Sequence, residues 1–422
     1  MTTDLVAFLR DTEVGHLGRD RHGRLTFRYE EKWRRAEDAY PLSLSMPLAL
    51  AEHRHATVDA YLWGLLPDNE IIIERWARRF QVSARNAFAL IAHVGEDCAG
   101  AIRFVTPERV SEIAADGTGE VDWLDEKDVA ERLRELRSDA SAWRRDTDSG
   151  QFSLAGAQPK TALLFDGKRW GVPSGRIPTT HILKPGMPDL DGHPENEHFC
   201  LSLARELGLP TARSRVEHFE DQVAIVVERY DRLRTPNGIV RIHQQDVCQA
   251  LAVRPANKYE NDGGPGVRAV VDLLREHSQA AEEDVETFVE SLVFNWLIAG
   301  TDAHAKNYSL LLGARGRARL APLYDVASAL PYVGKQLPKL KLAMKIGGNY
   351  RLREIGLHQW GKLASEVKLT ADHVEGVVRR MATALPDLAV DVLRRSGGEG
   401  LDHRALDLLA GALRERAQRC VA

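Results

Sequence analysis

The chain has 422 residues, of which 44% are hydrophobic and 28% are charged, and its formal net charge is −4. This length and hydrophobic content suit one large domain or two to three ordinary domains with real cores, and the charge excludes a strongly basic nucleic-acid-binding protein. Four cysteines without a Cys-x-x-Cys pair argue against a zinc site or a disulfide framework, and the lack of a signal segment or of an apolar run near ~20 residues predicts a cytosolic protein with no membrane contact.

The first hundred residues alternate short apolar runs with polar turns. Residues 5–9, 14–17 and 25–29 are predicted to form strands of a small antiparallel sheet. A helix is predicted from about Asn69 to Phe80, because apolar residues recur there at helical spacing. Its apolar face is predicted to consist of Ile71, Ile72, Trp76 and Phe80.

A charged stretch, residues 108–150, follows this N-terminal part. Within it, Val129, Leu133 and Leu136 predict an amphipathic helix. Residues 139–150 are expected to form an exposed connection, so we place a domain boundary at residue 150.

From residue 152 onward small residues and apolar strands dominate. A small-residue loop, residues 153–160, leads into a predicted hairpin with strands at 161–165 and 170–173. Residues 179–184, which end at Lys184, have an alternating side-chain pattern and are predicted to form a further strand. Small residues let backbone N–H groups approach phosphate oxygens, although an ordinary hairpin loop would look the same.

The order of the later elements is typical of a protein kinase. A helix predicted at 195–207 is followed by a buried strand at 223–230, and the chain is predicted to be mostly helical from Asp246 to Ala299. We therefore predict an α+β chain with a two-lobed protein-kinase-like fold, a small N-terminal α/β subdomain and a mostly helical C-terminal lobe. The expected units are an N-terminal subdomain (1–150), a nucleotide-binding part (151–235) and a helical catalytic lobe (236–422).

The candidate chemistry lies after an apolar helix predicted at residues 288–300. Asp302 is followed by Asn307 five positions later, and Asp325 comes after two predicted strands, 308–312 and 319–324. Kinases use an aspartate to accept the proton of the attacking hydroxyl, and an asparagine and a second aspartate to hold magnesium. The spacing alone also fits turn and capping residues.

Four further residues are candidates for roles in phosphoryl transfer because of their place in this order of elements. Lys184 is a candidate for neutralising nucleotide phosphates, with a lysine at a strand end as the alternative. Glu197 could pair with it or be an exposed carboxylate in the first turn of a helix. His304 and Lys306 could stabilise the charge of the γ-phosphate, or His304 could be structural.

Several segments of the chain resemble the HipA-type toxins, the serine/threonine kinases of bacterial type II toxin–antitoxin pairs. The resemblance covers nearly the full length. It is carried by residues 40–48, 65–68, 94–101, 153–160, 178–184, 195–197, 228–232, 258–266, 302–307 and 342–344. Pro159 stands where the family commonly has an acidic residue, and the segment between Lys184 and Glu195 is short.

The resemblance implies a role for each matching residue. Asp302 would be the catalytic base with His304 beside it, Asn307 and Asp325 would bind Mg²⁺, and Ser153 would be the site of autophosphorylation and self-inactivation. ATP would be bound by Ala155, Gly156, Ala157, Gln158, Pro159, Lys160, Lys184, Glu228, Arg229, Tyr230, Asp302, Ala303, His304 and Tyr324.

The resemblance also implies partners. The substrate would be a cellular protein of translation, notably an aminoacyl-tRNA synthetase, and the partner a helix-turn-helix antitoxin that binds operator DNA. Arg379 and Arg380 could touch DNA phosphates or form a solvated helix face. Two alternatives stay open: an ATP-binding co-repressor module without turnover, and a small-molecule phosphotransferase.

Overall fold

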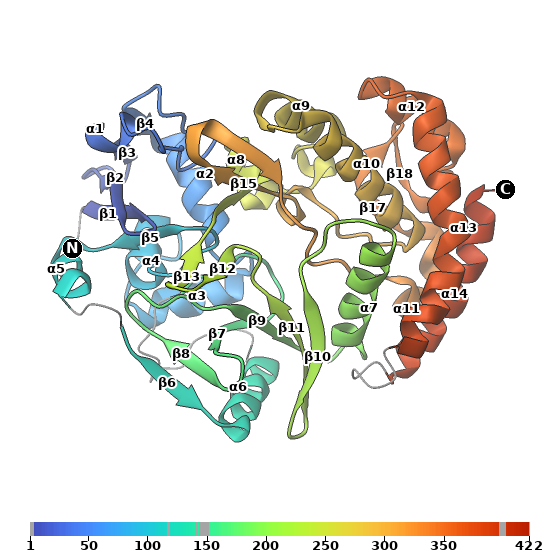
Figure 1. Cartoon of the computed structure of the whole chain (residues 1–422), viewed down its shortest axis with the longest axis horizontal. Helices are drawn as coiled ribbons and strands as arrows, with labels where there is room; N and C mark the ends of the chain where they lie inside the picture. Colours follow the sequence, from blue (N-terminus) through green and yellow to red (C-terminus); the bar gives the residue numbers. More distant parts are fainter. Residues whose placement is uncertain (1–3, 116–118, 140–141, 143–151, 396–401, 422) are drawn as a thin grey trace.

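The computed structural model describes residues 4–115, 119–139, 142, 152–395 and 402–421. The N-terminal sheet, a second sheet and a helical lobe follow one another across the molecule (Figure 1). The exposed connection predicted at residues 139–150 lies almost entirely outside the described residues. No helix within the described ranges is long and apolar enough to cross a membrane.

The N-terminal part is an antiparallel five-stranded sheet with the strand order β4-β3-β2-β1-β5. The three strands predicted from the sequence are confirmed. In β1 the side chains of Leu5, Ala7 and Leu9 are buried, as expected when alternate residues face one core. The strands are β1 (Asp4–Leu9), β2 (Thr12–Arg19), β3 (Leu25–Tyr29), β4 (Glu52–Arg54) and β5 (Ile102–Val105), and the helices are α1 (Glu31–Arg34), α2 (His55–Leu65), α3 (Glu70–Arg79), α4 (Ala87–Val94) and α5 (Pro107–Ala115).

Helix α3 confirms the predicted helix but corrects its apolar face. The Asn69 side chain accepts hydrogen bonds from the backbone N–H groups of the first turn, so the helix begins at Glu70. Ile71 is 60% exposed, whereas Ile73 is buried with Trp76. Ile73 is three residues from Trp76 and shares its face, while Ile71 is turned outward.

The second sheet carries the nucleotide-binding candidates. Its six strands follow the order β10-β11-β9-β7-β8-β6 and are antiparallel. Helix α6 (Glu126–Ser138) packs on one part of the sheet, and α7 (His193–Glu206) packs on β10 and β11. The strands are β6 (Val121–Leu124), β7 (Thr161–Phe165), β8 (Trp170–Pro173), β9 (His181–Pro185), β10 (Ser214–Phe219) and β11 (Gln222–Glu228).

Strand β6 and helix α6 precede residue 150 but belong to this second sheet. Val129, Leu133 and Leu136 of α6 are buried, which confirms the predicted amphipathic helix. Their partners are strands β9, β10 and β11 rather than the N-terminal sheet. The division at residue 150 stays a prediction, and the structure already assigns β6 and α6 to the sheet that follows it.

The C-terminal lobe is mostly helical, as predicted. Helix α10 (Ala281–Leu297) is buried throughout its last two turns, and Trp296 packs edge-on against Trp360, with ring centroids 5.7 Å apart. The remaining helices are α8 (Val247–Ala250), α9 (Val267–His277), α11 (Leu330–Val333), α12 (Leu357–Glu366), α13 (Ala371–Arg395) and α14 (Arg404–Val421). The strands are β12 (Arg232–Thr235), β13 (Gly238–Arg241), β14 (His243–Asp246), β15 (Ser309–Gly313), β16 (Arg317–Leu320), β17 (Lys341–Ile346) and β18 (Asn349–Arg351).

The strand predicted at residues 319–324 is shorter than expected, because β16 ends at Leu320 and the chain then runs to Asp325 without regular structure.

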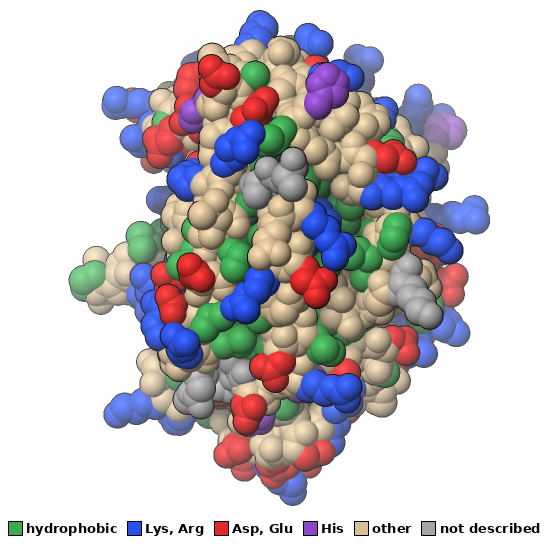
Figure 2. Space-filling view, turned by 90° about the vertical axis from the view of Figure 1, so that its right-hand side faces the viewer, with side chains coloured by type: hydrophobic (Ala, Val, Ile, Leu, Met, Phe, Trp, Pro, Cys, Tyr) green, Lys and Arg blue, Asp and Glu red, His purple; other side chains and the backbone are tan. Residues whose placement is uncertain are grey.

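On the face that α13 and α14 help to form, acidic and basic side chains are interspersed (Figure 2). Arg380 of α13 is paired with Glu290 over 2.5 Å. One of the two arginines predicted as candidate phosphate contacts is therefore already paired with a carboxylate of this chain.

Candidate active site

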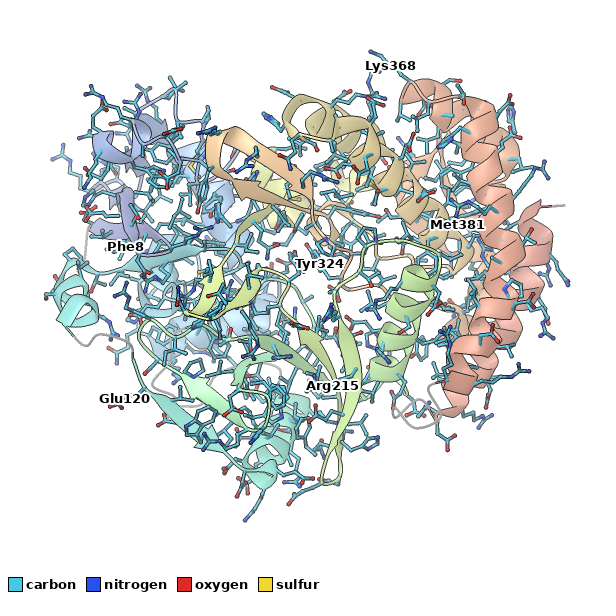
Figure 3. The ribbon with its side chains drawn as sticks, in the orientation of Figure 1. Phe8, Glu120, Arg215, Tyr324, Lys368 and Met381 are labelled. Carbon is cyan, nitrogen blue, oxygen red and sulfur yellow. The ribbon has the colours of Figure 1, made fainter. Side chains whose placement is uncertain are left out.

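A cavity of about 660 Å³ lies between the second sheet and the helical lobe. This volume is in the range of small-molecule and cofactor sites. Tyr324, one of its lining residues, is near the centre of the molecule, between the strands and the helices (Figure 3). The predicted residues that line the cavity are Ala155, Gly156, Ala157, Gln158, Pro159, Lys160, Lys184, Glu228, Arg229, Tyr230, Asp302, Ala303, His304, Asn307, Tyr324 and Asp325.

Lys184 links the two lobes inside this cavity. Its Nζ atom lies 2.6 Å from Glu197 Oε1 of α7 and 2.8 Å from Asp325 Oδ1. Glu197 is 1% exposed, so the alternative of an exposed first-turn carboxylate is wrong and the predicted pair with Lys184 is confirmed.

These contacts fix the charges of Lys184 and Asp325. Burial disfavours the ammonium form of Lys184, but Asp325 and Glu197 outweigh it and hold the pKa of Lys184 above its ordinary range. Burial likewise opposes ionisation of Asp325, yet Lys184 and Lys160 hold the pKa of Asp325 well below its ordinary range. Asp325 is therefore a carboxylate at neutral pH, with the charge that a metal ligand requires.

The catalytic-loop candidates follow directly from the end of α10. Ala299 adopts a left-handed conformation with φ 55°, which ends the helix and directs the chain to Asp302. Asn307 is buried, and its Nδ2 atom donates to the backbone oxygen of Asp302 over 2.8 Å. The carboxylate of Asp302 is exposed and accepts a hydrogen bond from Tyr259.

His304 lines the cavity but carries no positive charge at neutral pH. Its side chain is 4% exposed, and burial lowers its pKa below the ordinary value. Its Nδ1 atom has no hydrogen-bond partner among the described residues. A neutral imidazole can still donate one N–H to a phosphate oxygen, so the role of His304 at the γ-phosphate stays a prediction.

Lys306 lines the cavity, but its ammonium group is engaged by two buried carboxylates. Its Nζ atom is buried 3.3 Å from Asp68 Oδ1 and 3.3 Å from Asp246 Oδ2, and it donates to the backbone oxygen of Gly64. The two carboxylates hold the pKa of Lys306 above its ordinary range despite burial. This ammonium group fastens the catalytic loop to the N-terminal part, and a role on the γ-phosphate is not supported.

The small-residue loop is closed onto the cavity. Lys160 Nζ donates to the backbone oxygen of Ala155 over 2.8 Å, and a Cβ atom on Gly156 would lie 2.5 Å from that Nζ atom. Gly156 also has φ 105°, which L side chains rarely adopt. Burial lowers the pKa of Lys160 to about 8. The loop therefore requires glycine at this position and presents a second lysine to the cavity.

Ser153 is held in the interior by this loop conformation. Its Oγ atom donates to the backbone oxygen of Leu65 over 2.6 Å, and its N–H donates to the oxygen of Asp97 over 3.1 Å. The side chain is 0% exposed. A phosphate on Ser153 is incompatible with this position, so modification requires the loop to move.

The predicted hinge follows strand β11. The N–H of Arg229 donates to the oxygen of Thr180 over 2.9 Å, and the Tyr230 hydroxyl donates to Gln244. The ring of Tyr230 lies 5.8 Å from that of Tyr324, centroid to centroid. The two tyrosines, with their ring planes tilted by 34°, give this end of the cavity an aromatic wall, which suits an aromatic base.

A buried ionic cluster behind the hinge was missed by the sequence reasoning. Asp97 lies within 3.3 Å of nitrogen atoms of Arg229, Arg232 and Arg241, and Asp231 pairs with Arg229 and Arg232 over 3.0 Å. The family resemblance had indicated residues 94–101 and 228–232 without a reason for them. The structure supplies a reason, because the Asp97 carboxylate of the N-terminal part pairs there with the arginines of the hinge and of the strands that follow it.

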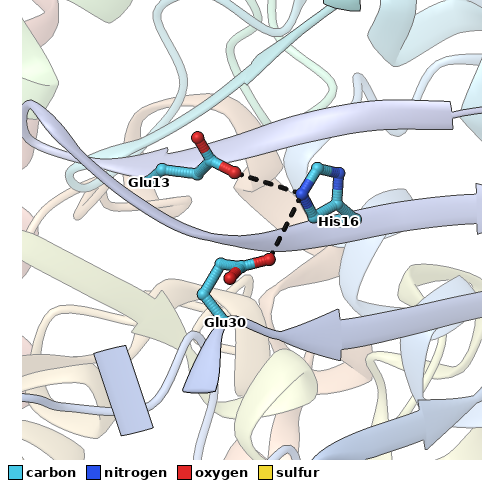
Figure 4. Close-up of side chains that lie close together, drawn as sticks. All are labelled: Glu13, His16 and Glu30. Carbon is cyan, nitrogen blue, oxygen red and sulfur yellow. Dashed lines mark hydrogen bonds and ion pairs between the residues drawn. The ribbon is translucent and has the colours of Figure 1, made fainter. Parts of the chain in front are cut away.

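A second group of possible metal ligands lies far from the cavity. Glu13 and Glu30 are 3.1 and 3.3 Å from His16 Nε2, at the surface of the N-terminal sheet (Figure 4). The opposite ring nitrogen of His16 lies 3.2 Å from Asp4. Ion pairing among these partly exposed groups accounts for the arrangement.

The cavity residues fit a nucleotide and a divalent cation. Asp325, Asn307 and Asp302 bring oxygen donors to the cavity, and oxygen is the ligand that Mg²⁺ requires. Lys160, at the end of the small-residue loop, and Lys184 bring two amines to the same cavity, as phosphate oxygens require. This set of donors is sufficient for a phosphoryl-transfer site.

Comparison with known proteins agrees with this geometry. Residues 5–105 match the HipA N-terminal domain and residues 152–389 match the HipA-like C-terminal domain. The protein called Putative kinase Y4mE of Sinorhizobium fredii is 35% identical over 391 residues, which cover 90% of this chain and 89% of that protein.

Two comparisons involve the same organism, Shewanella oneidensis. Its serine/threonine-protein kinase toxin HipA is 28% identical over 411 residues, which cover 93% of this chain and 90% of that protein. A solved complex of HipA, HipB and operator DNA from that species contains a chain that matches with a TM-score of 0.84 and 25% identity, covering 98% of this chain and 97% of that chain.

Proposed function

This chain belongs to the HipA family of kinase toxins, and we propose that it transfers the γ-phosphate of ATP to serine or threonine residues of a cellular protein. The observation that carries the proposal is the contact of Lys184 with both Glu197 and Asp325 at the cavity that Asp302 also lines. Kinases need this lysine–glutamate pair and this aspartate in place at the same time.

Each residue has a part in the proposed reaction. Bound Mg·ATP supplies the phosphoryl group and the metal charge that neutralises the phosphate oxygens. Lys184 and Lys160 hold the phosphates, Asn307 and Asp325 hold the metal, and the hinge at 228–230 with Tyr324 holds the base. Asp302 accepts the proton of the substrate hydroxyl, and its exposure gives that hydroxyl access.

Autophosphorylation of Ser153 is the proposed mode of self-inactivation. Because Ser153 is buried, a phosphorylated Ser153 and the loop from Ala155 to Lys160 cannot both occupy the positions that they have in this structure. A phosphate adds up to about two negative charges beside carboxylates and ATP phosphates, which favours the displaced loop.

The proposed partners follow from the family. We propose a HipB-like helix-turn-helix antitoxin, contact with operator DNA mainly through that antitoxin, and an aminoacyl-tRNA synthetase as the protein substrate. The match to a HipA chain in a complex with HipB and operator DNA supports the first two. A bacterial cytoplasmic location fits all three.

The decisive experiment combines binding with transfer. Parent protein, an Asp302→Gln variant and an Asp262→Asn control are incubated with Mg²⁺ and γ-labelled ATP after phosphatase treatment, and sites are mapped by mass spectrometry. Asp262 is an exposed carboxylate outside the cavity, so its variant should behave like the parent.

The expected result is label on Ser153 in the parent and the control, with none in the Asp302→Gln variant although it still binds Mg·ATP in calorimetry. Binding without transfer in all three proteins would instead support the ATP-binding co-repressor. Transfer only to small molecules would support the small-molecule phosphotransferase.

A further inference from the structure

The carboxylate of Asp302 already holds a hydroxyl group in this structure. Tyr259 Oη donates to Asp302 Oδ1 over 2.6 Å, the length of a charge-assisted O–H···O⁻ hydrogen bond. A general base must lie about 2.6–3.2 Å from the oxygen whose proton it takes. The phenol of Tyr259 therefore lies where the hydroxyl of a protein substrate has to lie.

Tyr259 reaches Asp302 from outside the nucleotide cavity. Asp302, His304 and Lys258 line the cavity, whereas Tyr259 is not one of its lining residues. The side chain of Tyr259 is only partly buried. Since ATP would occupy the cavity, the side on which Tyr259 lies is the side left for an incoming protein.

Hydrogen bonds and ring packing hold the segment around Tyr259 against the loop that contains Asp302 and His304. The N–H of Ala305 donates to the oxygen of Lys258, and the Tyr259 ring packs edge-on against His304, with centroids 4.9 Å apart. The oxygen of Tyr259 accepts a hydrogen bond from the N–H of Gly264 over 2.9 Å. The contact with Asp302 is thus built by the fold around it.

The phenol is a hydrogen-bond donor throughout the neutral range. Burial and the negative charge of Asp302 raise the pKa of Tyr259 above its ordinary value. Tyr259 therefore keeps its proton, as the hydroxyl of an alcohol substrate would, and donates a hydrogen bond to Asp302 Oδ1.

We propose that Tyr259 is a latch that sets acceptor access: its hydroxyl occupies the acceptor position on Asp302 until the serine or threonine hydroxyl of a docked protein displaces it. This inference rests on the proposed kinase function. Although Asp302 is exposed, its Oδ1 atom is already occupied by Tyr259, so any hydroxyl group that uses this oxygen as its base must first displace the phenol. A substrate must supply enough contact energy to move Tyr259 aside, so the latch favours large docked proteins over small acceptors.

The test removes only the hydroxyl. Tyr259→Phe keeps the ring on His304, and Tyr350→Phe is the control, because Tyr350 is another partly buried tyrosine of the same lobe and does not contact Asp302. ADP release from Mg·ATP without any protein acceptor measures transfer to water. Label transfer to a pool of serine- and threonine-centred peptides measures transfer to small unspecific acceptors.

The latch predicts that Tyr259→Phe raises both rates at least about tenfold, the worth of one hydrogen bond to a charged group. The KM for ATP and the rates of the control should stay within about twofold of the parent. Rates that fall or do not change in Tyr259→Phe would overturn the latch and leave Tyr259 as a positioning residue. Phosphate on Tyr259 itself would also overturn it.

Failure of the kinase proposal gives a different result. If parent and control do not bind Mg·ATP in calorimetry, the phosphotransferase function itself fails. If they bind Mg·ATP but no variant transfers phosphate, the kinase proposal also fails, in favour of the ATP-binding co-repressor. If parent and control do transfer phosphate and Tyr259→Phe releases ADP no faster than they do, the latch alone is refuted.

Discussion

Replacing Asp97 by asparagine tests how the N-terminal part supports the catalytic lobes. Asp97 receives hydrogen bonds from Arg232 over 2.9 Å, Arg241 over 3.2 Å and Arg229 over 3.3 Å, and its Oδ2 atom accepts the Thr179 hydroxyl over 2.7 Å. Asparagine keeps the size but removes the charge. It also places N–H groups opposite other donors, so Asp231 is left to balance three guanidinium groups.

The loss should be large because the whole cluster is buried. Removing one partner of a buried ion pair costs about 3–5 kcal/mol. With an unfolding entropy of about 2.1 cal/mol/K per residue over the 422 residues, such a loss lowers the Tm by about 3–6 °C. The hinge should also shift, so we expect weaker binding of Mg·ATP.

The pH dependence of this effect has a definite sign. Burial raises the pKa of Asp97, but the surrounding arginines outweigh it and hold the folded-state pKa well below the ordinary value. Its stabilising contribution is therefore complete above the ordinary aspartate pKa of about 4 and is lost as the pH falls through the lower folded value. The difference between parent and Asp97→Asn should shrink in strong acid.

Scanning calorimetry and urea unfolding at pH 7 measure the effect. Asp221→Asn is the matched control, since Asp221 pairs with Arg134 at the surface, where ion pairs contribute little. A stability loss in Asp97→Asn below about 1 kcal/mol, or no larger than that of the control, would refute the reasoning that this cluster joins the N-terminal part to the hinge.

Three further predictions concern the cavity. Lys184→Met leaves Glu197 and Asp325 without their cation, and we expect kcat to fall by at least about 100-fold in the labelled-ATP assay, where an unchanged kcat would contradict the assigned role. The Kd for Mg·ATP should be flat below about pH 8 and rise above it, because the pKa of Lys160 is about 8 and only its ammonium form attracts phosphate; Lys160→Arg, which stays charged, should abolish that rise in calorimetric titrations. Ser153→Asp should raise the same Kd at least about tenfold, because a buried hydroxyl that donates to Leu65 is replaced by a carboxylate. Ser153→Ala should keep a Kd near that of the parent. Equal Kd values for the two variants would show that the loop does not respond to charge.

The sequence predicted those features that depend on neighbours along the chain. The strands that carry Lys184 and the helix that begins near Glu195 were predicted from periodicity, and the structure contains them as β9 and α7. The order of loop, lysine strand, helix, hinge and Asp302 loop was enough to predict a kinase-like fold, which the match to a solved HipA chain confirms.

Features that depend on distant partners could not be predicted in this way. Lys306 was expected to face a phosphate because it is close to Asp302 in sequence, but its carboxylate partner Asp68 lies far back in the N-terminal part. Ile71 and Ile73 are equally apolar, and packing against the rest of the core leaves Ile73 buried and Ile71 60% exposed. The hydrogen bond of Tyr259 to Asp302 likewise joins segments 43 residues apart.

The bond from Lys306 to Gly64 spans 242 residues of chain, and this separation has a consequence for synthesis. A bacterial ribosome adds about 5–20 residues per second, so Gly64 waits roughly 12–50 s for its partner. During that interval the loop that contains Asp302 and Lys306 has not been synthesised, and the backbone oxygen of Gly64 has no Lys306 from which to accept a hydrogen bond. We therefore expect the proposed kinase activity to be absent from nascent chains until nearly three quarters of the protein has been made.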